Sequence, residues 1–245
     1  KADSFKYQGD GRRRSGCEKE VMESFLPKRI VTIDGPAGAG KTTVSRMLAK
    51  QAGYTYVDTG ALYRAVALMV KQNGIDVENK EELSAFLSCL TLEFIPTPEG
   101  PRLYADGMDV TDRIRTPEIS LLSSSVSAIP AVRAFLLGLQ RCLGAKRGVV
   151  FEGRDMGTVV FPDADVKIFL TADPHVRAER RFKELQSTSG PSLSQVESDM
   201  NKRDTQDATR KLAPLTPAKD AQIIDCTHLD ATEVVNRIHH ILLTR

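Results

Sequence analysis

The sequence predicts an α/β fold in which a doubly wound parallel sheet is flanked by helices. Five short, β-branched apolar runs alternate with longer stretches whose apolar residues recur at helical spacing. The runs are nearly continuously apolar, as strands buried on both faces are. Alternation of this kind is typical of parallel sheets with helical crossovers. The predicted strands cover residues 29–34, 54–60, 148–155, 166–172 and 221–227, and the predicted helices cover residues 42–53, 60–74, 131–148, 174–186 and 232–243.

Composition and charge narrow the partners that the chain is expected to have. Apolar residues make up 41% and charged residues 27% of the 245 residues, as in ordinary globular proteins. The 34 basic and 32 acidic residues leave a net charge of +2, which does not favour nucleic acid or an anionic membrane as a partner. No apolar run approaches the ~20 residues of a membrane span. We therefore expect a cytoplasmic monomer that binds no nucleic acid and no membrane, or a protein of an organelle stroma if the N-terminus is a trimmed targeting segment.

Three stretches depart from the alternation of strands and helices. Residues 1–27 are polar and lack a sustained apolar periodicity, which predicts a disordered extension ahead of a domain at residues 28–245. Residues 90–114 alternate apolar and polar positions around two turn signals, which predicts a small antiparallel meander in an insertion at about residues 86–125. Residues 187–195 are polar and irregular and precede a charged helix from Val196, which predicts a hinge and a lid.

The first predicted strand leads into a glycine-rich motif, residues 35–42, called the phosphate-binding loop below. Gly35, Gly40, Lys41 and Thr42 stand in the order GxxxxGK(S/T) between an apolar strand and a helix. Small residues let the backbone N–H groups of residues 37–43 surround a phosphate, and the next helix adds its N-terminal dipole. We expect Lys41 on the β- and γ-phosphates and Thr42 on Mg²⁺, the alternative being a tight turn without a ligand. The predicted ATP-binding residues are Gly35, Pro36, Ala37, Gly38, Ala39, Gly40, Lys41, Thr42 and Thr43.

Asp34 ends the first predicted strand directly before this loop. We favour a structural role in which its carboxylate orients the phosphate-binding loop, because a loop of this shape needs support from neighbouring groups. Direct contact with a ligand is the alternative.

Polar residues that follow two other predicted strands indicate a second anionic substrate. Thr59 and Arg64 stand near the start of a predicted helix, where free N–H groups, a hydroxyl and an arginine suit a phosphate. Glu152, Arg154 and Asp155 stand at the carboxyl end of a buried strand, where open α/β sheets bind their ligands.

Two predicted helices in the last third of the chain carry arginines at helical spacing. Each cluster alone is typical of a solvated face with ion pairs, but together with a phosphate-binding loop they favour a second phosphorylated substrate. No Ser-His-Asp or Cys-His arrangement is evident. The clusters are Arg177, Arg180 and Arg181, and Arg203, Asp207 and Arg210.

Taken together, these motifs resemble those of bacterial-type cytidylate kinases, which are nucleoside-monophosphate (NMP) kinases of the P-loop NTPase class. The likeness runs in unbroken order from about Arg29 to the C-terminus, through the segments TIDGPAGAGKTT, DTGALYR, SVSAIPAVR, FEGRDMGTVVFPDADVKIFLTA and RDTQDATRKLAPL. The phosphate-binding loop is shared by many NTPases, whereas GRDMGTVVFPDA is highly specific to this family. The resemblance implies a five-stranded parallel core, an NMP-binding region at about residues 59–133 that contains the antiparallel insert, and a helical lid at about residues 186–213.

The resemblance also implies roles for individual residues. The implied CMP contacts are Thr59, Arg64, Arg154 and Arg210 for the phosphate, Ser124, Arg133 and Asp155 for cytosine, and Arg203 and Asp207 for the sugar. Arg180 matches an arginine near the transferring phosphate. The implied catalytic residues are Lys41, Arg154, Arg180, Arg203 and Arg210.

The lid departs from that of arginine-richer family members. Gln206, Ala208 and Thr209 stand at positions where arginines can occur, although Arg203 and Arg210 remain. This difference leaves the number of lid cations that reach the phosphates as a question for the structure.

Asp155 and Arg133 complement the hydrogen-bonding edge of cytosine. Cytosine has an amino donor beside the acceptors N3 and O2, and uracil reverses the first two positions. We therefore expect a strong preference for CMP over UMP. The alternative is that Asp155 only pairs with Arg154 and supports the end of the strand.

The resemblance implies reversible transfer of the γ-phosphoryl group of ATP to CMP or dCMP, with Mg²⁺ as cofactor, in pyrimidine nucleotide metabolism. The products are CDP or dCDP and ADP. One alternative is a kinase for another small substrate, such as UMP or a non-nucleotide acid. Another is a regulatory module that binds nucleotide and has lost catalysis.

Overall fold

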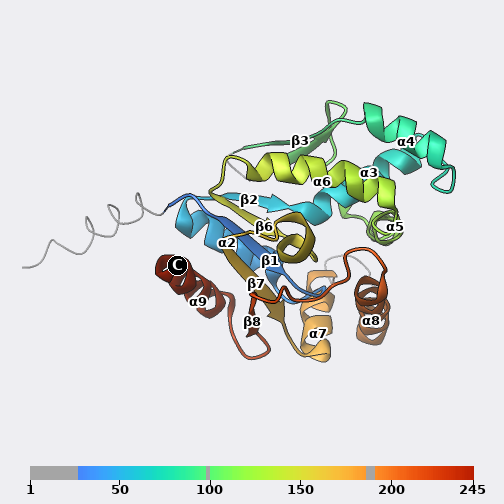
Figure 1. Cartoon of the computed structure of the whole chain (residues 1–245). Coiled ribbons are helices and arrows are strands. Elements are labelled where there is room, and N and C mark those ends of the chain that lie inside the picture. The colour runs from blue at the N-terminus through green and yellow to red at the C-terminus, as the bar shows by residue number, and fades with distance from the viewer. Residues whose placement is uncertain (1–26, 98–99, 186–190) are drawn as a thin grey trace, which may run out of the picture.

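A computed structural model of the chain describes residues 27–97, 100–185 and 191–245. At its centre lies a five-stranded sheet in the order β2-β6-β1-β7-β8 (Figure 1). Every pairing within it is parallel, and each strand lies inside its predicted segment, so the predicted doubly wound sheet is confirmed. The strands are β1 (Ile30–Asp34), β2 (Thr55–Asp58), β6 (Val149–Glu152), β7 (Val166–Thr171) and β8 (Gln222–Asp225).

Two hydrophobic clusters cover the two faces of the sheet, because side chains alternate along each strand. On one face, Val31 and Ile33 of β1 pack with residues of α2 and α9. On the other face, Phe151 of β6 packs against Met156 and Val160 of the segment after β6, with α6 alongside. All five predicted helices are present: α2 (Lys41–Ala52), α3 (Thr59–Gln72), α6 (Pro130–Gly144), α7 (Pro174–Leu185) and α9 (Ala231–Thr244).

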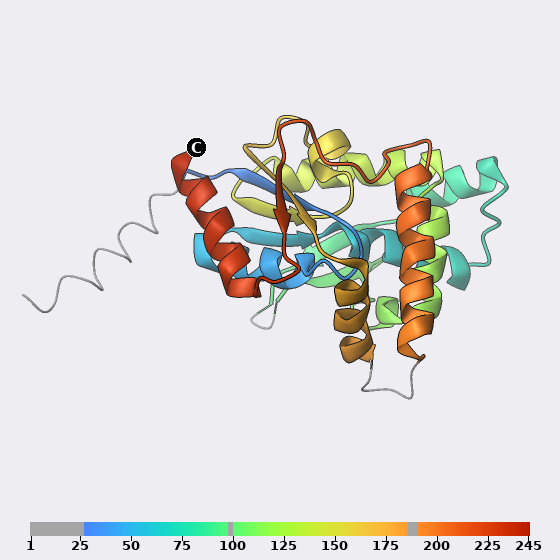
Figure 2. The same ribbon diagram turned by 90° about the horizontal axis from the view of Figure 1, so that it is seen from below.

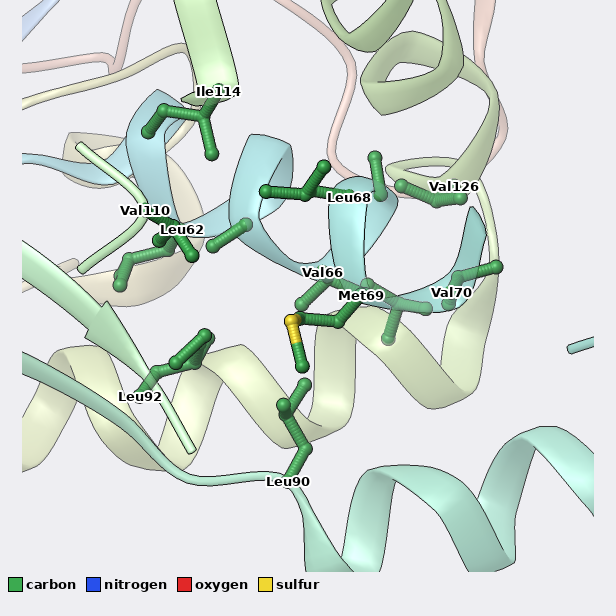
Figure 3. Close-up of a cluster of buried hydrophobic side chains, with 14 of the residues drawn as sticks. Leu62, Val66, Leu68, Met69, Val70, Leu90, Leu92, Val110, Ile114 and Val126 are labelled. Atoms are coloured by element: carbon green, nitrogen blue, oxygen red, sulfur yellow. The ribbon is translucent and has the colours of Figure 1, made fainter. Parts of the chain in front are cut away.

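A third cluster gives the predicted NMP-binding region, at about residues 59–133, a core of its own. Leu62, Val66 and Met69 of α3 lie among Leu90 and Leu92, which lead into the small sheet (Figure 3). The predicted meander is confirmed as an antiparallel sheet in the order β3-β4-β5. Two helices that the sequence did not predict frame it. These elements are α4 (Lys80–Cys89), β3 (Leu92–Ile95), β4 (Arg102–Ala105), β5 (Met108–Asp109) and α5 (Pro117–Val126).

The two helices missing from the prediction begin at capping residues that the sequence does show. The Asn79 side chain accepts from the backbone N–H of Glu82 at the start of α4, and Thr116 accepts from that of Ile119 at the start of α5. Each helix has only ten residues, so apolar periodicity is a weak signal there. The capping residues were therefore a stronger sequence signal for these two helices than the apolar periodicity.

Helix α5 runs into α6 across a bend of 99°. Val126 of α5 and Leu136 of α6 are fully buried in the same cluster as α3. Within the described ranges, no single helix combines the length and apolar composition of a membrane span, and only α5 and α6 taken as a bent pair pass that test.

The segment after β6 differs from its prediction. The strand ends at Glu152, and residues Met156–Val160 form a short π-helical turn, η2. The Asp34 carboxylate accepts hydrogen bonds from the backbone N–H groups of Met156 at 2.9 Å and Gly157 at 2.8 Å. Burial raises the pKa of Asp34 to about 6. Asp34 thus has a structural role, but it supports the turn after β6 rather than the phosphate-binding loop.

Helices α7 and α8 (Leu193–Thr209) lie side by side and extend away from the sheet (Figure 2). Ala178 of α7 packs against Val196 and Met200 of α8. Helix α8 begins before the predicted Val196, because the Ser192 side chain caps it by accepting from the N–H of Gln195. Residues 187–190 of the predicted hinge and residues 1–26 of the predicted extension lie outside the described residues.

At Gly35 the backbone of the phosphate-binding loop packs directly against strand β7 of the sheet. Its φ is 145°, and a Cβ atom there would lie 2.1 Å from the carbonyl oxygen of Leu170 in β7. Gly53, with φ of 65°, has no atom within 4 Å of the corresponding position. We expect Gly35→Ala to lower the free energy of unfolding by ~3 kcal/mol or more, and Gly53→Ala by only ~1 kcal/mol from backbone strain. Denaturant titration of both variants measures this, and equal losses would contradict the close approach.

Candidate active site

The phosphate-binding loop lies between β1 and α2 with its backbone pressed against neighbouring elements. Gly35, Gly38 and Gly40 all have positive φ values. A Cβ atom at Gly38 would lie 2.8 Å from the carbonyl oxygen of Arg177 in α7. Helix α2 begins at Lys41 with no side-chain cap and no acidic residue in its first turn. Its first N–H groups are therefore left for an anion.

Lys41 is a buried cation inside this loop. Its side chain is folded back, and Nζ donates to the carbonyl oxygen of Pro36 at 2.6 Å. Burial lowers the pKa of Lys41, and the nearby charges of Arg154 and Arg203 lower it further. Since a buried ammonium group beside other cations is unfavourable without a counter-charge, the surroundings of Lys41 suit a phosphate.

Glu152 joins the phosphate-binding loop to the next strand. Its Oε1 atom accepts from the Thr42 hydroxyl at 2.7 Å, and its Oε2 atom accepts from the Tyr56 hydroxyl at 2.6 Å. Burial raises the pKa of this carboxyl, and the charge of Asp58 adds to the effect. The sequence placed Glu152 at the strand end without giving it a role. An acidic residue at the carboxyl end of a buried strand was the available signal, but that this strand lies beside β1 is shown only by the structure.

The pair of Thr42 and Glu152 fits a magnesium site. Mg²⁺ prefers oxygen ligands and takes only one or two from the protein when nucleotide phosphates supply others. A hydroxyl that already donates its proton to a carboxylate has its lone pairs free for a cation. The predicted role of Thr42 therefore agrees with the residues around it.

Five charged residues from α6, the β6 end and α8 form an arginine–aspartate network. Arg133 donates to Asp155 Oδ2, and Arg210 Nη2 lies 3.6 Å from Asp155 Oδ1. Asp207 Oδ1 lies 3.7 Å from Arg210 Nη1, and its Oδ2 accepts from Arg154 Nε at 3.1 Å. The alternative that Asp155 pairs only with Arg154 is thereby contradicted, because the hydrogen-bonded partner of Arg154 is Asp207.

Cations outnumber acids where this network meets the phosphate-binding loop. Among the described residues, Arg203 Nε is a buried atom without a hydrogen-bond partner, and Arg210 Nη2 has no hydrogen bond but lies 3.6 Å from the Asp155 carboxylate. Burial, with the charge of Arg154, lowers the pKa of Arg203 to about 10. Buried donors of this kind are costly unless an anion fills the space beside them.

The other predicted CMP contacts lie around this network with partners of their own. Thr59 donates to the carbonyl oxygen of Glu152 at 2.6 Å, and Arg64 pairs with Asp58 at 2.9 Å. Ser124 of α5 donates to Oε1 of Gln206 in α8 at 3.0 Å. Gln206 thus joins the lid to the NMP-binding region, a contact that the sequence did not indicate.

Tyr63 of α3 is a further neighbour of the network that the sequence did not single out. Arg133 Cζ lies 5.8 Å from the centre of its ring. Burial raises the pKa of Tyr63 to about 12, against the opposing effect of Arg133. The motif DTGALYR contains this tyrosine directly before Arg64, so its place was visible although its neighbours were not.

A cavity of about 280 Å³ opens on the other side of the phosphate-binding loop. It is lined by Gly38 and Gly40, by Arg180 of α7 and by Cys226 and Leu229 after β8. Arg180 Nη2 donates to the carbonyl oxygen of Cys226 at 2.7 Å, which holds the guanidinium at the edge of this cavity. Arg180 therefore lies beside the phosphate-binding loop, at the edge of this cavity.

The three predicted arginines of α7 do not share one binding partner. Arg177 is buried and donates to the carbonyl oxygen of Ala37 at 3.0 Å, and it also pairs with Asp204 of α8. Asp204 in turn accepts from the N–H of Ala37 at 3.3 Å. Arg181 points to solvent and pairs with Glu184. Asp204 follows the predicted Arg203 in sequence, but only the packing of α7 on α8 shows that it meets the phosphate-binding loop.

Comparison with known proteins identifies the family. The sequence model described as "Cytidylate kinase" matches residues 31–243. A cytidylate kinase from Pelotomaculum thermopropionicum is 47% identical over 210 residues, which cover 85% of this chain and 93% of that protein. A bifunctional pantoate ligase/cytidylate kinase from Prochlorococcus marinus is 44% identical over 92% of this chain and 44% of its own length. An uncharacterized protein from Eubacterium ventriosum, 15% identical, matches the fold with a TM-score of 0.52 over 89% of this chain and 100% of its own.

A second relative supports the same conclusion over most of its own length. A cytidylate kinase from Geobacter sulfurreducens is 46% identical over 217 residues, which cover 88% of this chain and 93% of that protein. The likeness suggested by the motifs is thereby confirmed along the whole domain and not only at the phosphate-binding loop. The chain belongs to the cytidylate kinase family.

Proposed function

We propose that this site transfers the γ-phosphoryl group of ATP to the phosphate of CMP or dCMP, giving ADP and CDP or dCDP. One observation carries the proposal: a phosphate-binding loop with the buried cation Lys41 lies beside two half-buried arginines, Arg154 and Arg203, and Arg203 Nε is a buried donor without a hydrogen-bond partner. A reaction between two phosphate groups needs cations on both sides of the transferring group. Membership of the cytidylate kinase family supports the choice of donor and acceptor.

The chemistry requires positioning and charge neutralisation rather than a base. The attacking atom is an anionic phosphate oxygen, so no proton has to be removed from it. The N–H groups of residues 37–43 would hold the donor phosphates, and Lys41 would exchange the Pro36 carbonyl for a phosphate oxygen. Thr42, oriented by Glu152, would hold Mg²⁺, which when bound neutralises charge on the β- and γ-phosphates.

The acceptor would occupy the space around the arginine–aspartate network. Its phosphate would contact Arg154 and Arg210, with Thr59 and Arg64 at the start of α3. Cytosine would face Asp155 together with Arg133 and Ser124. Asp207, which pairs with two arginines of the network, would contact the sugar.

Arg203 calls for a refinement of its implied role. The charges that act most strongly on its pKa after burial are Arg154 and then Asp207. The charge of Arg203 also acts on Lys41. These neighbours support a contact with the transferring phosphate rather than with the sugar.

The donor nucleoside would lie in the cavity beside the phosphate-binding loop, with Arg180 near the phosphates. The contacts of Arg177 and Asp204 with Ala37 support a lid at about residues 186–213 that closes on this loop. Closure would exclude water that otherwise hydrolyses ATP. The NMP-binding region at about residues 59–133, the monomeric state and the cytoplasmic location stay predictions.

Lys41→Ala should lower kcat by ~10³ or more, because Lys41 is the side chain placed to neutralise the transferring group. Its matched control is Lys50→Ala, an exposed lysine in the last turn of the same helix, which should leave kcat unchanged. A coupled assay of ADP release measures both, with thermal denaturation to confirm folding. Near wild-type turnover in folded Lys41→Ala would reject the assignment.

Acceptor preference tests the function as a whole. In the same assay CMP and dCMP should be strongly preferred over UMP, AMP and shikimate, by up to ~10⁴ in kcat/KM for CMP over UMP, since mispaired buried groups discriminate strongly. Asp155→Ala should lower turnover of CMP and reduce the CMP/UMP ratio, because it removes both the attraction for the amine and the repulsion of uracil O4. Asp163→Ala, at an exposed aspartate nearby, is the control. An unchanged ratio in Asp155→Ala would exclude base recognition by this residue.

The boundary of the kinase domain is tested by truncation. Arg29 Nη1 donates to the carbonyl oxygen of Leu242 in α9, and the Tyr54 hydroxyl donates to that of Pro27, so the domain is proposed to begin near residue 28. A chain without residues 1–26 should keep its Tm and its kcat/KM for CMP. Loss of either would show that the boundary lies earlier.

A further inference from the structure

We propose that Tyr56 is a positioning residue for the metal and phosphate site, acting through Glu152 on Thr42. The proposal rests on the proposed function, in which Thr42 holds the Mg²⁺ that accompanies ATP. Tyr56 would act on the metal site through Glu152, because its hydroxyl donates to Oε2 of that carboxylate.

The geometry is a chain of two short hydrogen bonds across three elements. Tyr56 lies in β2, beside β6, with its residue 8% exposed. Its hydroxyl donates to Oε2 of Glu152 at 2.6 Å, and the other oxygen, Oε1, accepts from the Thr42 hydroxyl at 2.7 Å. A donor on each oxygen sets the plane of the carboxylate, so the acceptor offered to Thr42 cannot rotate freely.

The position of that acceptor decides where the Thr42 lone pairs point. A threonine hydroxyl has one proton and two lone pairs, and the direction of the proton determines the direction of the lone pairs. With Glu152 held by Tyr56, the proton of Thr42 stays on Oε1 and the lone pairs stay available to a cation. Partners of this kind, one step away from a metal ligand, commonly change metal affinity 10- to 100-fold.

The surroundings of Tyr56 allow its hydroxyl to be removed alone. Arg46 of α2 lies over the ring, with Cζ 5.3 Å from the ring centre. Tyr56→Phe keeps the ring, its packing and this cation–π contact, and deletes only the hydrogen bond to Glu152. Tyr54→Phe is the matched control, because the Tyr54 hydroxyl donates to the Pro27 carbonyl and accepts from the Arg29 N–H, both of which lie before the phosphate-binding loop.

Calorimetric binding of ADP with and without Mg²⁺ separates a positioning role from a structural one. The Kd of ADP without Mg²⁺ divided by the Kd with Mg²⁺ reports the contribution of the metal to binding. Its measurement requires no turnover. We expect Tyr56→Phe to reduce this ratio by ~10-fold. The Kd of ADP without Mg²⁺ should stay unchanged, and Tyr54→Phe should match wild type in both conditions. Equal weakening with and without the metal, or no weakening, would overturn the proposal.

A second background tests whether Tyr56 acts through Glu152. Glu152→Ala removes the carboxylate, so adding Tyr56→Phe to it should lower the Kd ratio no further. A further ~10-fold fall of the Kd ratio in the double variant would show that the Tyr56 hydroxyl acts by a route other than Glu152. If Glu152→Ala does not fold, the Kd ratio of Tyr56→Phe alone tests the proposal. A wild-type protein that binds ADP equally with and without Mg²⁺ would instead contradict the metal assignment at Thr42. Failure of the positioning role of Tyr56 and failure of the metal assignment at Thr42 therefore give different results.

Discussion

Glu152 is the residue on which the rest of the site depends, because it ends the strand that lies between β1 and β2. In a parallel sheet, residues at the end of a strand reach the loops that follow both neighbouring strands. Glu152 therefore meets Thr42, in the helix after β1, through its side chain and Thr59, in the helix after β2, through its main chain. The proposed donor and acceptor sides of the site share this contact with Glu152, so their separation is set by the spacing of the strands.

Charge distribution explains why so many cations can be buried here. The arginine–aspartate network alternates in sign, and each aspartate lies between two arginines. That alternation limits the repulsion among Arg133, Arg154 and Arg210 while it leaves an excess of positive charge. Arg203 and Lys41 add to this excess, and the uncapped start of α2 adds a partial positive charge of its own. A nucleotide with several phosphates would supply the missing negative charge.

The elements around the site differ in how firmly they are held. The phosphate-binding loop is pressed against β7 and α7, where close approach leaves room only for glycine at positions 35 and 38. The NMP-binding region has its own hydrophobic core on α3, and α7 with α8 forms a third unit around Ala178. Polar contacts join these units, such as Ser124 with Gln206, Ala37 with Asp204 and the ion pairs of the arginine–aspartate network. Contacts of this kind between separately packed units are the ones that the proposed opening and closing of the site would exchange.

The sequence by itself determined the sheet, the phosphate-binding loop and the family, because each follows from a pattern between near neighbours. Buried parallel strands must be apolar throughout, and a loop around a phosphate must be glycine-rich. The tertiary structure alone decided which charges meet. Asp155 stands next to Arg154 in the sequence but pairs with Arg133 and Arg210, while Arg154 reaches Asp207, 53 residues away. Tyr56, Glu152 and Thr42 likewise come together only because β2 and β1 flank β6, and the order of strands in a sheet is not written in any local pattern of residues.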